Sequence, residues 1–394
     1  MPSRPTAVPA ALLLAGLILA CGGIEPPQAP TATAADPPAA ASDYDWQLPP
    51  GFPTPAVPPD NPMSAEKVEL GRRLFYDRRL SGNGTFSCAS CHRQELAFTD
   101  GRARAVGSTG ELHSRSSMSL ANVAYSRTLT WADPDLDRLE EQMLTPMFGE
   151  HPIELGLAGR EAELIERLEA DASYRHLFRR AFPAGAAPSV GDVTRAIAAF
   201  QRTLISGTSD YDRYVYLGES DALPVEAKRG MRLFFSARLG CSECHAGFTF
   251  SGPIRYRDAE DEPVFHNTGL YDVDGLGGYP AIDTGLHRLT GEAPDMGRFR
   301  APTLRNVAVT APYMHDGSIA ELAEVIDHYA RGGRELLFGE LAGDGARNRY
   351  KSDIISGFEL SDGEKEDLLA FLDSLTDETF LTDSRHADPF ADHH

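Results

Sequence analysis

The stretch "CASCH", Cys88–His92, is repeated later in the chain as "CSECH", Cys241–His245. C-x-x-C-H is the attachment pattern of c-type haem: the two thiols bind the porphyrin covalently, and the adjoining histidine binds the iron from one side. A redox-active cysteine pair or a four-cysteine zinc site is the alternative for either copy, but neither gives the histidines a role. The repeat therefore predicts two covalent haems. They would be held by Cys88, Cys91 and His92, and by Cys241, Cys244 and His245.

The similarity extends to the segment before each motif. "EKVELGRRLFYDRRL" (66–80) precedes the first copy and "VEAKRGMRLFFSARL" (225–239) precedes the second. Ser64 and Pro224 are plausible helix starts, and the apolar residues that follow recur at helical spacing. The first copy has additional residues, within "SGNGTFS" (81–87), before its cysteine. This duplication predicts a mainly α-helical protein with two cytochrome c-like domains, each wrapping one covalent c-type haem.

The bulk composition fits this organisation. The 394 residues are 42% hydrophobic and 24% charged, as in globular proteins. A formal net charge of −21 argues against nucleic acid as a partner, because phosphates require a basic face. We expect a signal peptide at 1–21, a Pro- and Ala-rich tether at 22–60, an N-terminal domain at 61–220, a C-terminal domain at 221–380 and a tail at 381–394.

The N-terminus is typical of an exported protein. Arg4 precedes the apolar run "AALLLAGLILA" (10–20), which is too short to span a bilayer. The run ends in "ILAC", which resembles the lipobox of bacterial lipoproteins, with Cys21 as the lipidated residue. By the same resemblance, Gly22 after the cysteine implies the outer membrane. A plain secretory signal and a buried N-terminal helix are the alternatives. We expect a periplasmic protein that touches the membrane only through a lipid anchor.

Three further segments extend the pattern beyond the haem motifs: "FTDGR" (98–102), "RAPTLRNVAVTAPYMHDGS" (300–318) and "LSDGEKEDLLAFLDSLT" (360–376). With them, the chain from about Asn61 to Thr379 resembles the bacterial di-haem cytochrome c peroxidase and MauG superfamily. "VGSTGELHSRSSMSLANVAY" (106–125) and "HPIELG" (151–156) resemble most the di-haem enzymes associated with methanobactin-type copper proteins. The resemblance implies that the first haem reacts with peroxide and that the second is a six-coordinate electron relay.

The resemblance also implies catalytic residues at the first haem. Glu154 in "HPIELG" matches the distal glutamate of the family, a group that moves a proton between the two peroxide oxygens. Gln142 in "LEEQM" matches its companion glutamine, although the spacing to Glu154 is two residues longer than the family pattern. Glu150 is a weaker substitute, and a solvated surface position is the alternative for any of these acids. His113 lies where classical members carry a distal histidine, but we expect an exposed loop residue there.

Two further roles follow from the same resemblance. Trp131 in "LTWADPD" lies where the family has an aromatic residue that relays electrons between the haems, with a core tryptophan as the alternative. Asn122, with the backbone carbonyls of Thr310 and Pro312, matches the family's calcium site, and such oxygen ligands suit a hard cation. The alternative for these three residues is a capped turn.

The second ligand of the second haem distinguishes the branches of the family. In "SIAELAEVIDHYARGG" (318–333), Ser318 and Glu321 have capping-box spacing, and the glycines end the helix. At 100° per residue, Tyr329 falls on the apolar stripe, whereas His328 points away from it. Classical peroxidases carry methionine at this position and MauG-like members carry tyrosine, so the resemblance implies Tyr329. Met314 is the alternative, and Met296 and His328 are weaker candidates.

These residues predict an enzyme that uses H2O2 to form a high-valent state shared over two haems and then oxidises a protein partner, at tryptophan residues. A copper-binding lipoprotein is the partner that the resemblance suggests. The first alternative is a cytochrome c peroxidase that detoxifies H2O2 with electrons from a small cytochrome or copper protein. A di-haem electron carrier is the second, and Glu154 argues against it.

Overall fold

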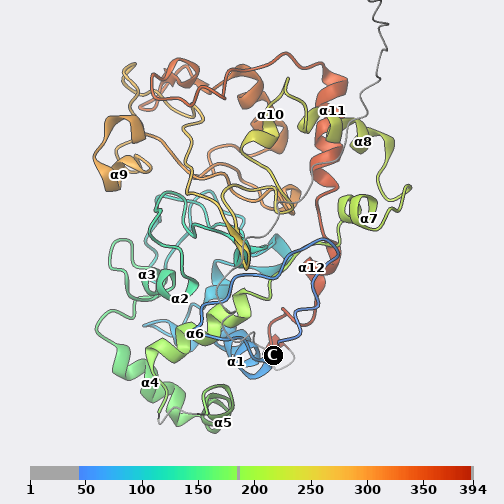
Figure 1. Ribbon diagram of the computed structural model, residues 1–394. Helices are drawn as coiled ribbons and strands as arrows, with labels where there is room; N and C mark the ends of the chain where they lie inside the picture. Colours follow the sequence, from blue (N-terminus) through green and yellow to red (C-terminus); the bar gives the residue numbers. More distant parts are fainter. Residues whose placement is uncertain (1–43, 184–186, 392–394) are drawn as a thin grey trace, which may run out of the picture. The chain divides into compact units, whose positions relative to one another are not determined.

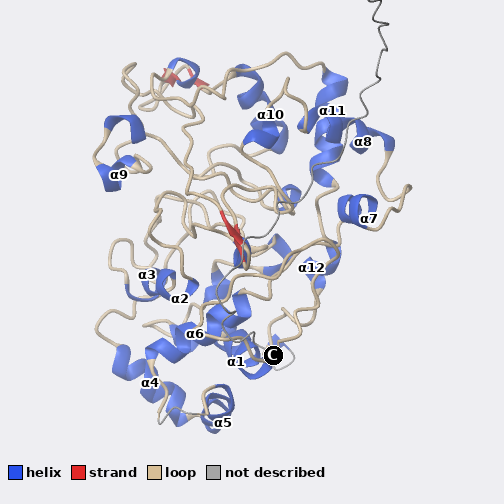
Figure 2. Ribbon diagram, viewed as in Figure 1, coloured by secondary structure: helices blue, strands red, loops and turns tan. Residues whose placement is uncertain are grey.

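Helices make up most of the regular structure of residues 44–183 and 187–391, which the computed structural model describes (Figures 1 and 2). The strands in these ranges form two short antiparallel pairs, β1 (Arg255–Tyr256) with β2 (Ala259–Glu260) and β3 (Glu335–Leu336) with β4 (Gly343–Asp344). The mainly α expectation is confirmed. The α-helices are α1 (Ala65–Tyr76), α2 (Leu139–Gln142), α3 (Leu144–Phe148), α4 (Glu161–Ala170), α5 (Ala172–Ala181), α6 (Val190–Gln201), α7 (Asp210–Tyr216), α8 (Val225–Phe234), α9 (His287–Thr290), α10 (Leu322–Arg331), α11 (Asp362–Asp373) and α12 (Glu378–Thr382).

The duplicated segments form equivalent helix pairs. Helix α1 packs on α6, and α8 packs on α11. Gly71 of α1 lies so close to α6 that a Cβ would stand 1.9 Å from the Ala196 carbonyl oxygen. Gly230 of α8 has the same relation to the Asp367 carbonyl of α11, again at 1.9 Å. The glycine shared by the two sequence copies is therefore required where each pair of helices crosses.

Each helix pair is the centre of a hydrophobic core. Phe75 of α1 packs edge-to-face on Phe200 of α6, and Phe234 of α8 packs on Phe371 of α11. The predicted helix start at Ser64 is confirmed, because its side chain accepts a hydrogen bond from the backbone of Lys67. The predicted domain boundary at 220/221 falls between α7 and α8 and stays a prediction.

The ends of the described chain pack more closely than we expected from composition. Phe52, in the expected tether, is buried and packs on Phe248, with ring centroids 4.8 Å apart. The expected tail also returns to the N-terminal half, where the Tyr76 hydroxyl donates to the His386 carbonyl. Aromatic side chains at both ends explain the difference, since rings such as Phe52 anchor a segment that is otherwise rich in proline.

Helix α10 begins later than the sequence pattern predicts. Glu321 is its N-cap, with Glu324 completing the capping box, and Gly332 ends it in the left-handed conformation. Ser318 is not a cap, because the neighbouring Ile319 forms a β-bridge with Tyr313 and keeps this stretch extended. The predicted C-terminal end is confirmed.

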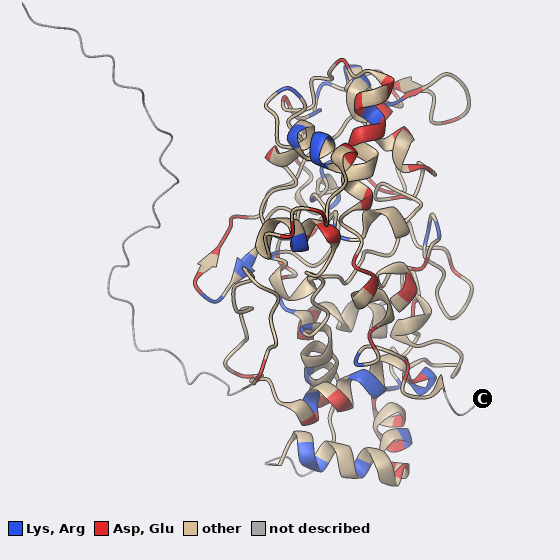
Figure 3. Ribbon diagram, turned by 90° about the vertical axis from the view of Figure 1, so that its right-hand side faces the viewer, with Lys and Arg blue, Asp and Glu red and all other residues tan. Residues whose placement is uncertain are grey.

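Charged residues of both signs are distributed over the helices and loops (Figure 3). The loop between β1 and β2 and the residues after it carry an exposed acidic run, residues 258–262. None of the helices in the described ranges is long and apolar enough to cross a membrane. Cys21 and the expected signal peptide lie outside the described residues.

Candidate haem sites

Both motifs adopt the same local structure. Each begins with a 3-10 turn, Cys88–Ser90 or Cys241–Glu243, and the histidine N–H then bonds to the carbonyl of the first cysteine at 3.0 Å. The four cysteines are free thiols. Burial raises the pKa to about 12 for Cys88 and Cys91 and to about 11 for Cys241 and Cys244. Protonated thiols of this kind do not suit a redox-active pair, which needs a thiolate.

The histidine rings are held by backbone carbonyls. The Nδ1 atom of His92 lies 2.8 Å from the Phe98 carbonyl oxygen, and that of His245 lies 3.2 Å from the Phe250 carbonyl and 3.1 Å from that of Pro302. Burial lowers the pKa of both histidines, to about 4 for His245. Each ring is therefore neutral with Nδ1 as donor, which leaves Nε2 as the atom able to bind a metal.

Sequence reasoning missed the residues that supply these carbonyls. Phe98 and Phe250 are both fully buried, and both have positive φ, 62° and 50°. The bend turns each carbonyl back toward the histidine of its motif. A phenylalanine follows the histidine by six residues in one copy and by five in the other, which was the available signal.

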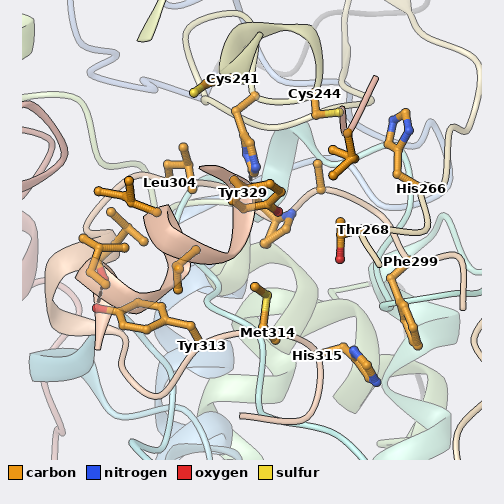
Figure 4. A pocket seen from close by; sticks show the side chains of 18 of the residues that line it. Cys241, Cys244, His266, Thr268, Phe299, Leu304, Tyr313, Met314, His315 and Tyr329 are labelled. Atoms are coloured by element: carbon orange, nitrogen blue, oxygen red, sulfur yellow. Dashed lines mark hydrogen bonds between the residues drawn. The ribbon is translucent and has the colours of Figure 1, made fainter. Parts of the chain in front are cut away.

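A cavity of about 390 Å³ lies against the second motif (Figure 4). Cys241, Cys244 and His245 line it, together with apolar side chains that include Leu304, Val325 and Ile326. This combination of two thiols, one imidazole nitrogen and an apolar wall fits a c-type haem. No group of three or more His, Cys, Asp or Glu side chains in the described ranges is arranged to hold a metal ion by itself.

Tyr329 lines this cavity from α10 and lies near the centre of the view in Figure 4. Its side chain is partly exposed, because it faces the open cavity. Burial raises the pKa of this phenol, and the neighbouring Cys244 and Cys241 add to the effect. A phenol that faces the cavity in this way presents an oxygen that haem iron could bind.

The alternative ligands differ in position. Met314 also lines the cavity, with φ of 73°, so it stays a candidate. His328 is buried but is not among the lining residues. Met296 packs in a separate apolar cluster beside the cavity. The expectation that Tyr329 faces the haem site agrees with the cavity lining, whereas the expectation that His328 points away from the interior is wrong, because its side chain is buried beside the cavity's neighbouring residues.

Trp131 lies in the wall of the same cavity, although it belongs to the N-terminal half. Its indole Nε1–H donates to the Ser116 carbonyl at 3.0 Å, and its own carbonyl accepts from Arg300. The segment 116–119 lines the cavity as well, and its Ser119 hydroxyl donates at 2.7 Å to the carbonyl of Ala97, the residue before Phe98, whose own carbonyl holds the His92 ring. One short segment therefore contacts both sites, with Trp131 beside it.

Glu154 lies near the first motif, close enough that its charge adds to the rise in the pKa of the Cys88 and Cys91 thiols, and its segment is held from two sides. Its carbonyl accepts from Ser108 at 2.7 Å, and the next carbonyl, of Leu155, accepts from Gly82 at 2.7 Å. Gly82 belongs to the residues that only the first copy contains before its cysteine. Burial raises the pKa of Glu154 to about 7. A carboxyl group with this pKa can both release and accept a proton near neutral pH.

His113 is the residue that the structure brings to Glu154. Its Nε2 lies 3.7 Å from a carboxylate oxygen of Glu154. Its Nδ1 accepts from the Arg115 backbone N–H at 3.1 Å, so the proton of the neutral ring is on Nε2, toward the carboxyl group. Burial lowers the pKa of His113. We expected an exposed loop histidine; instead the loop pairs with the segment that carries Glu154 and leaves the ring half-buried.

Gln142, the expected companion of Glu154, is the last residue of α2. No hydrogen bond between their side chains is present in the described part of the chain, so this pairing stays a prediction. Glu150 is exposed.

The expected calcium ligands have other contacts. Asn122 is buried in the left-handed conformation, where its amide oxygen accepts from the Ser206 N–H at 3.0 Å and its amide nitrogen donates to the Ser206 carbonyl at 2.9 Å. Asn306 is its counterpart in the second half: it has the same conformation, and its amide oxygen accepts from the Asp377 N–H at 2.7 Å. Thr310 and Pro312 line the cavity. These contacts fit the capped-turn alternative, and the calcium site stays a prediction.

Comparison with known proteins identifies the family. A family model for di-haem cytochrome c peroxidase matches residues 65–221. The methylamine utilization protein MauG of Methylorubrum extorquens is 33% identical over 377 residues, which cover 93% of this chain and 95% of that protein. The cytochrome-c peroxidase IdrP1 of Pseudomonas sp. (strain SCT) is 36% identical over 348 residues, 83% of this chain and 86% of that protein.

Solved structures agree. A MauG-like protein associated with microbial copper homeostasis is 50% identical and superposes with a TM-score of 0.86, covering 88% of this chain and 99% of the other. The diheme peroxidase BthA from Burkholderia thailandensis shares the fold, with 22% identity and a TM-score of 0.62. The chain therefore belongs to the di-haem cytochrome c peroxidase and MauG family, and it is an oxidoreductase of the peroxidase type.

Proposed function

We propose that this protein uses H2O2 to oxidise a protein partner, with tryptophan side chains of the partner as the target. Two covalent c-type haems would be held by the two C-x-x-C-H motifs, with Tyr329 as the second ligand of the C-terminal haem. The observation that carries the proposal is the position of Tyr329, whose phenol faces the cavity that Cys241, Cys244 and His245 also line.

At the first site the bound haem would supply the iron at which peroxide is reduced. The protein would supply the proton transfer. Glu154, with a pKa near 7, is suited to take a proton from one peroxide oxygen and to deliver it to the other. His113 presents an Nε2–H toward the same carboxyl group, so it can help hold Glu154 in position.

At the second site Tyr329 would bind as a phenolate. An anionic oxygen ligand stabilises oxidised iron better than a thioether does, so oxidising equivalents could be shared between the two haems. Trp131 is suited to carry them, because it lies in the cavity wall and is hydrogen-bonded to Ser116, in the segment that also bonds to Ala97 beside the first site. This arrangement favours electron removal from a large partner at the protein surface.

A copper-binding lipoprotein is the partner that we propose. Support comes from the 50% identity to a MauG-like protein associated with microbial copper homeostasis. We further propose that the chain is periplasmic and anchored to the outer membrane through lipid on Cys21. Both proteins would then be held at the same membrane.

The test uses the full chain loaded with both haems, a purified copper-binding lipoprotein and H2O2. Peptide mass spectrometry should detect added oxygen on tryptophan residues of the lipoprotein, only when peroxide and enzyme are both present. The Tyr329→Phe variant should leave the lipoprotein unmodified. An unmodified lipoprotein in the presence of the wild-type enzyme, with rapid oxidation of a reduced small cytochrome instead, would contradict the proposal.

That second outcome describes the alternative function, a cytochrome c peroxidase that detoxifies H2O2. One observation favours it: Met314 lines the same cavity as Tyr329 and is the kind of ligand that classical peroxidases carry. The peroxidase IdrP1 is also among the relatives of this chain. The two functions therefore differ at the second haem, and the identity of its ligand separates them.

We also propose a bound calcium ion near Asn122, Thr310 and Pro312. The support is the resemblance of these residues to the family pattern and the oxygen ligands they offer. Its test is described with the other predictions below.

A further inference from the structure

A buried cluster of aromatic side chains borders the cavity of the second site. Tyr279 and Phe299 line the cavity, whereas Tyr271 lies one ring further from it. The rings of Tyr271 and Tyr279 are in edge-to-face contact, with centroids 5.6 Å apart. Only 3% of Tyr271 and 5% of Tyr279 is exposed. The two phenols therefore form a short chain that leads away from the cavity.

The hydroxyl groups of these two tyrosines have different partners. The Tyr279 hydroxyl donates to the Asn267 side-chain oxygen at 2.9 Å and accepts from the Leu270 N–H at 3.1 Å. The Tyr271 hydroxyl donates to a carboxylate oxygen of Asp316 at 2.6 Å. That length is typical of a hydrogen bond between a hydroxyl group and an ionised acceptor.

This difference decides which phenol can be oxidised. A phenol that loses an electron becomes strongly acidic and must pass its proton to a base. A carboxylate such as Asp316 can take up that proton, whereas the neutral amide of Asn267 cannot. Of the two tyrosines in contact, Tyr271 is therefore the one that can form a stable neutral radical.

We infer that Tyr271 is a redox-active residue that donates an electron toward the second haem site and passes its phenolic proton to Asp316. The inference rests on the proposed peroxide chemistry of the same site. Reduction of one H2O2 to two waters consumes two electrons and two protons, and Tyr271 would supply one of those electrons. Its O–H bond breaks, an O–H bond forms on Asp316, and a neutral phenoxyl radical remains. An electron from an outside donor restores the phenol, and the proton returns from Asp316.

The surroundings of this pair support the transfer. Burial raises the pKa of Tyr271 to about 12, so the group is a phenol and not a phenolate at neutral pH. The Ser318 N–H donates to the other carboxylate oxygen of Asp316 at 3.1 Å and so orients the carboxylate toward Tyr271. Asp316 is half-buried, and both of its carboxylate oxygens are held by hydrogen bonds in this arrangement.

The experiment uses the protein loaded with both haems and mixed with one equivalent of H2O2. Samples frozen within milliseconds are measured by electron paramagnetic resonance, with and without ring-deuterated tyrosine. We expect a radical signal in the wild type that narrows on deuteration. It should be absent in Tyr271→Phe and weaker by at least about tenfold in Asp316→Asn, which cannot take up the proton.

Tyr313→Phe is the matched control. Tyr313 also lines the cavity, but its hydroxyl donates to the neutral carbonyl of Val307, so its loss should leave the signal unchanged. The Tyr271→Phe variant removes only a hydroxyl group, because Asn348 bonds to the backbone carbonyl of Tyr271 and keeps the main chain in place.

Two results would overturn the inference: a tyrosyl signal that persists in Tyr271→Phe, or a protein radical that does not narrow on tyrosine deuteration. Oxidation of the partner protein is measured separately by mass spectrometry. A tyrosyl signal without partner oxidation would contradict only the proposed function. Partner oxidation without a tyrosyl signal would contradict only the role of Tyr271.

Discussion

In each half of the molecule, the side of the haem site that carries the C-x-x-C-H motif is built from equivalent residues; we call this the shared side. The opposite side is built from different residues in the two halves. On the shared side, both have a glycine where two helices cross, a histidine ring held by a phenylalanine carbonyl, and a buried asparagine in the left-handed conformation. On the other side, the first site has Glu154 and His113, whereas the second has Tyr329 from α10. The duplicated parts hold the motif, and the parts that differ determine the chemistry.

The extra residues of the first copy illustrate how this difference arises. Gly82, in the stretch 81–87, bonds to the segment that carries Glu154. The second copy has no such stretch, since Leu239 is followed almost directly by Cys241. A short insertion beside the first motif thus supports the segment that carries Glu154, and the second site has no such support.

The largest expected effect comes from removing the carboxylate of Glu154. Glu154→Gln should lower the rate of reaction with H2O2 by at least about tenfold, because the amide cannot accept a proton. Stopped-flow absorption of the haem-loaded protein measures this rate. Glu150→Gln is the control, since Glu150 is exposed and lies in the same segment. Equal rates in wild type and Glu154→Gln would remove Glu154 from the mechanism.

The same carboxyl group predicts a pH dependence. Burial raises the pKa of Glu154 to about 7, and only the ionised form can take a proton from peroxide. The rate should therefore fall as the pH drops below about 7. The fall should be missing in Glu154→Gln. A wild-type rate that is flat from acidic to neutral pH would show that another group accepts the proton.

The equivalence of the two helix pairs can be tested at the glycines where the helices cross, Gly71 and Gly230. Gly71→Ala and Gly230→Ala should each lower the free energy of unfolding by about 1–3 kcal/mol, because the new methyl group meets a backbone carbonyl. Urea unfolding of the haem-loaded protein measures the change. Gly363→Ala is the control in α11, where a Cβ meets no atom within 4 Å. A neutral Gly71→Ala with a destabilising Gly230→Ala would show that the two helix pairs are not equivalent.

The smallest expected effect is a shift in melting temperature that distinguishes Asn122 from Asn306. If calcium binds near Asn122, a chelator should lower the melting temperature of the wild type and of Asn306→Ala, since bound ligand stabilises the folded state. The chelator should have no effect on Asn122→Ala. Equal shifts in both variants, or none in the wild type, would mean that Asn122 only holds the Ser206 backbone.

The sequence was most informative where the fold depends on local pattern. The motif repeat, the N-cap at Ser64 and the orientation of Tyr329 all follow from residues close together in the chain. The contact of His113 with Glu154 depends on two loops that pair across the chain, so no local pattern reveals it. The roles of the Phe98 and Phe250 carbonyls could not be predicted, because every residue has a backbone carbonyl and its direction depends on the local backbone conformation.

Ser318 and the chain ends show the same limit. The capping-box spacing at Ser318 is overridden by the bridge between Ile319 and Tyr313, which is tertiary structure. Phe52 was assigned to a tether because its neighbours are rich in Pro, but its ring packs on Phe248. Composition describes a segment on average, whereas one aromatic side chain is enough to anchor it.

The central claim is that Tyr329 gives the second site its own chemistry. Electron paramagnetic resonance of the resting, haem-loaded protein tests it most directly, with Tyr329→Phe and Met314→Leu compared against the wild type. We predict that Tyr329→Phe loses the low-spin signal of the second haem, because its iron loses a ligand, while Met314→Leu keeps it. A wild-type signal in Tyr329→Phe, with its loss in Met314→Leu, would contradict the claim and identify the second site as that of an ordinary peroxidase.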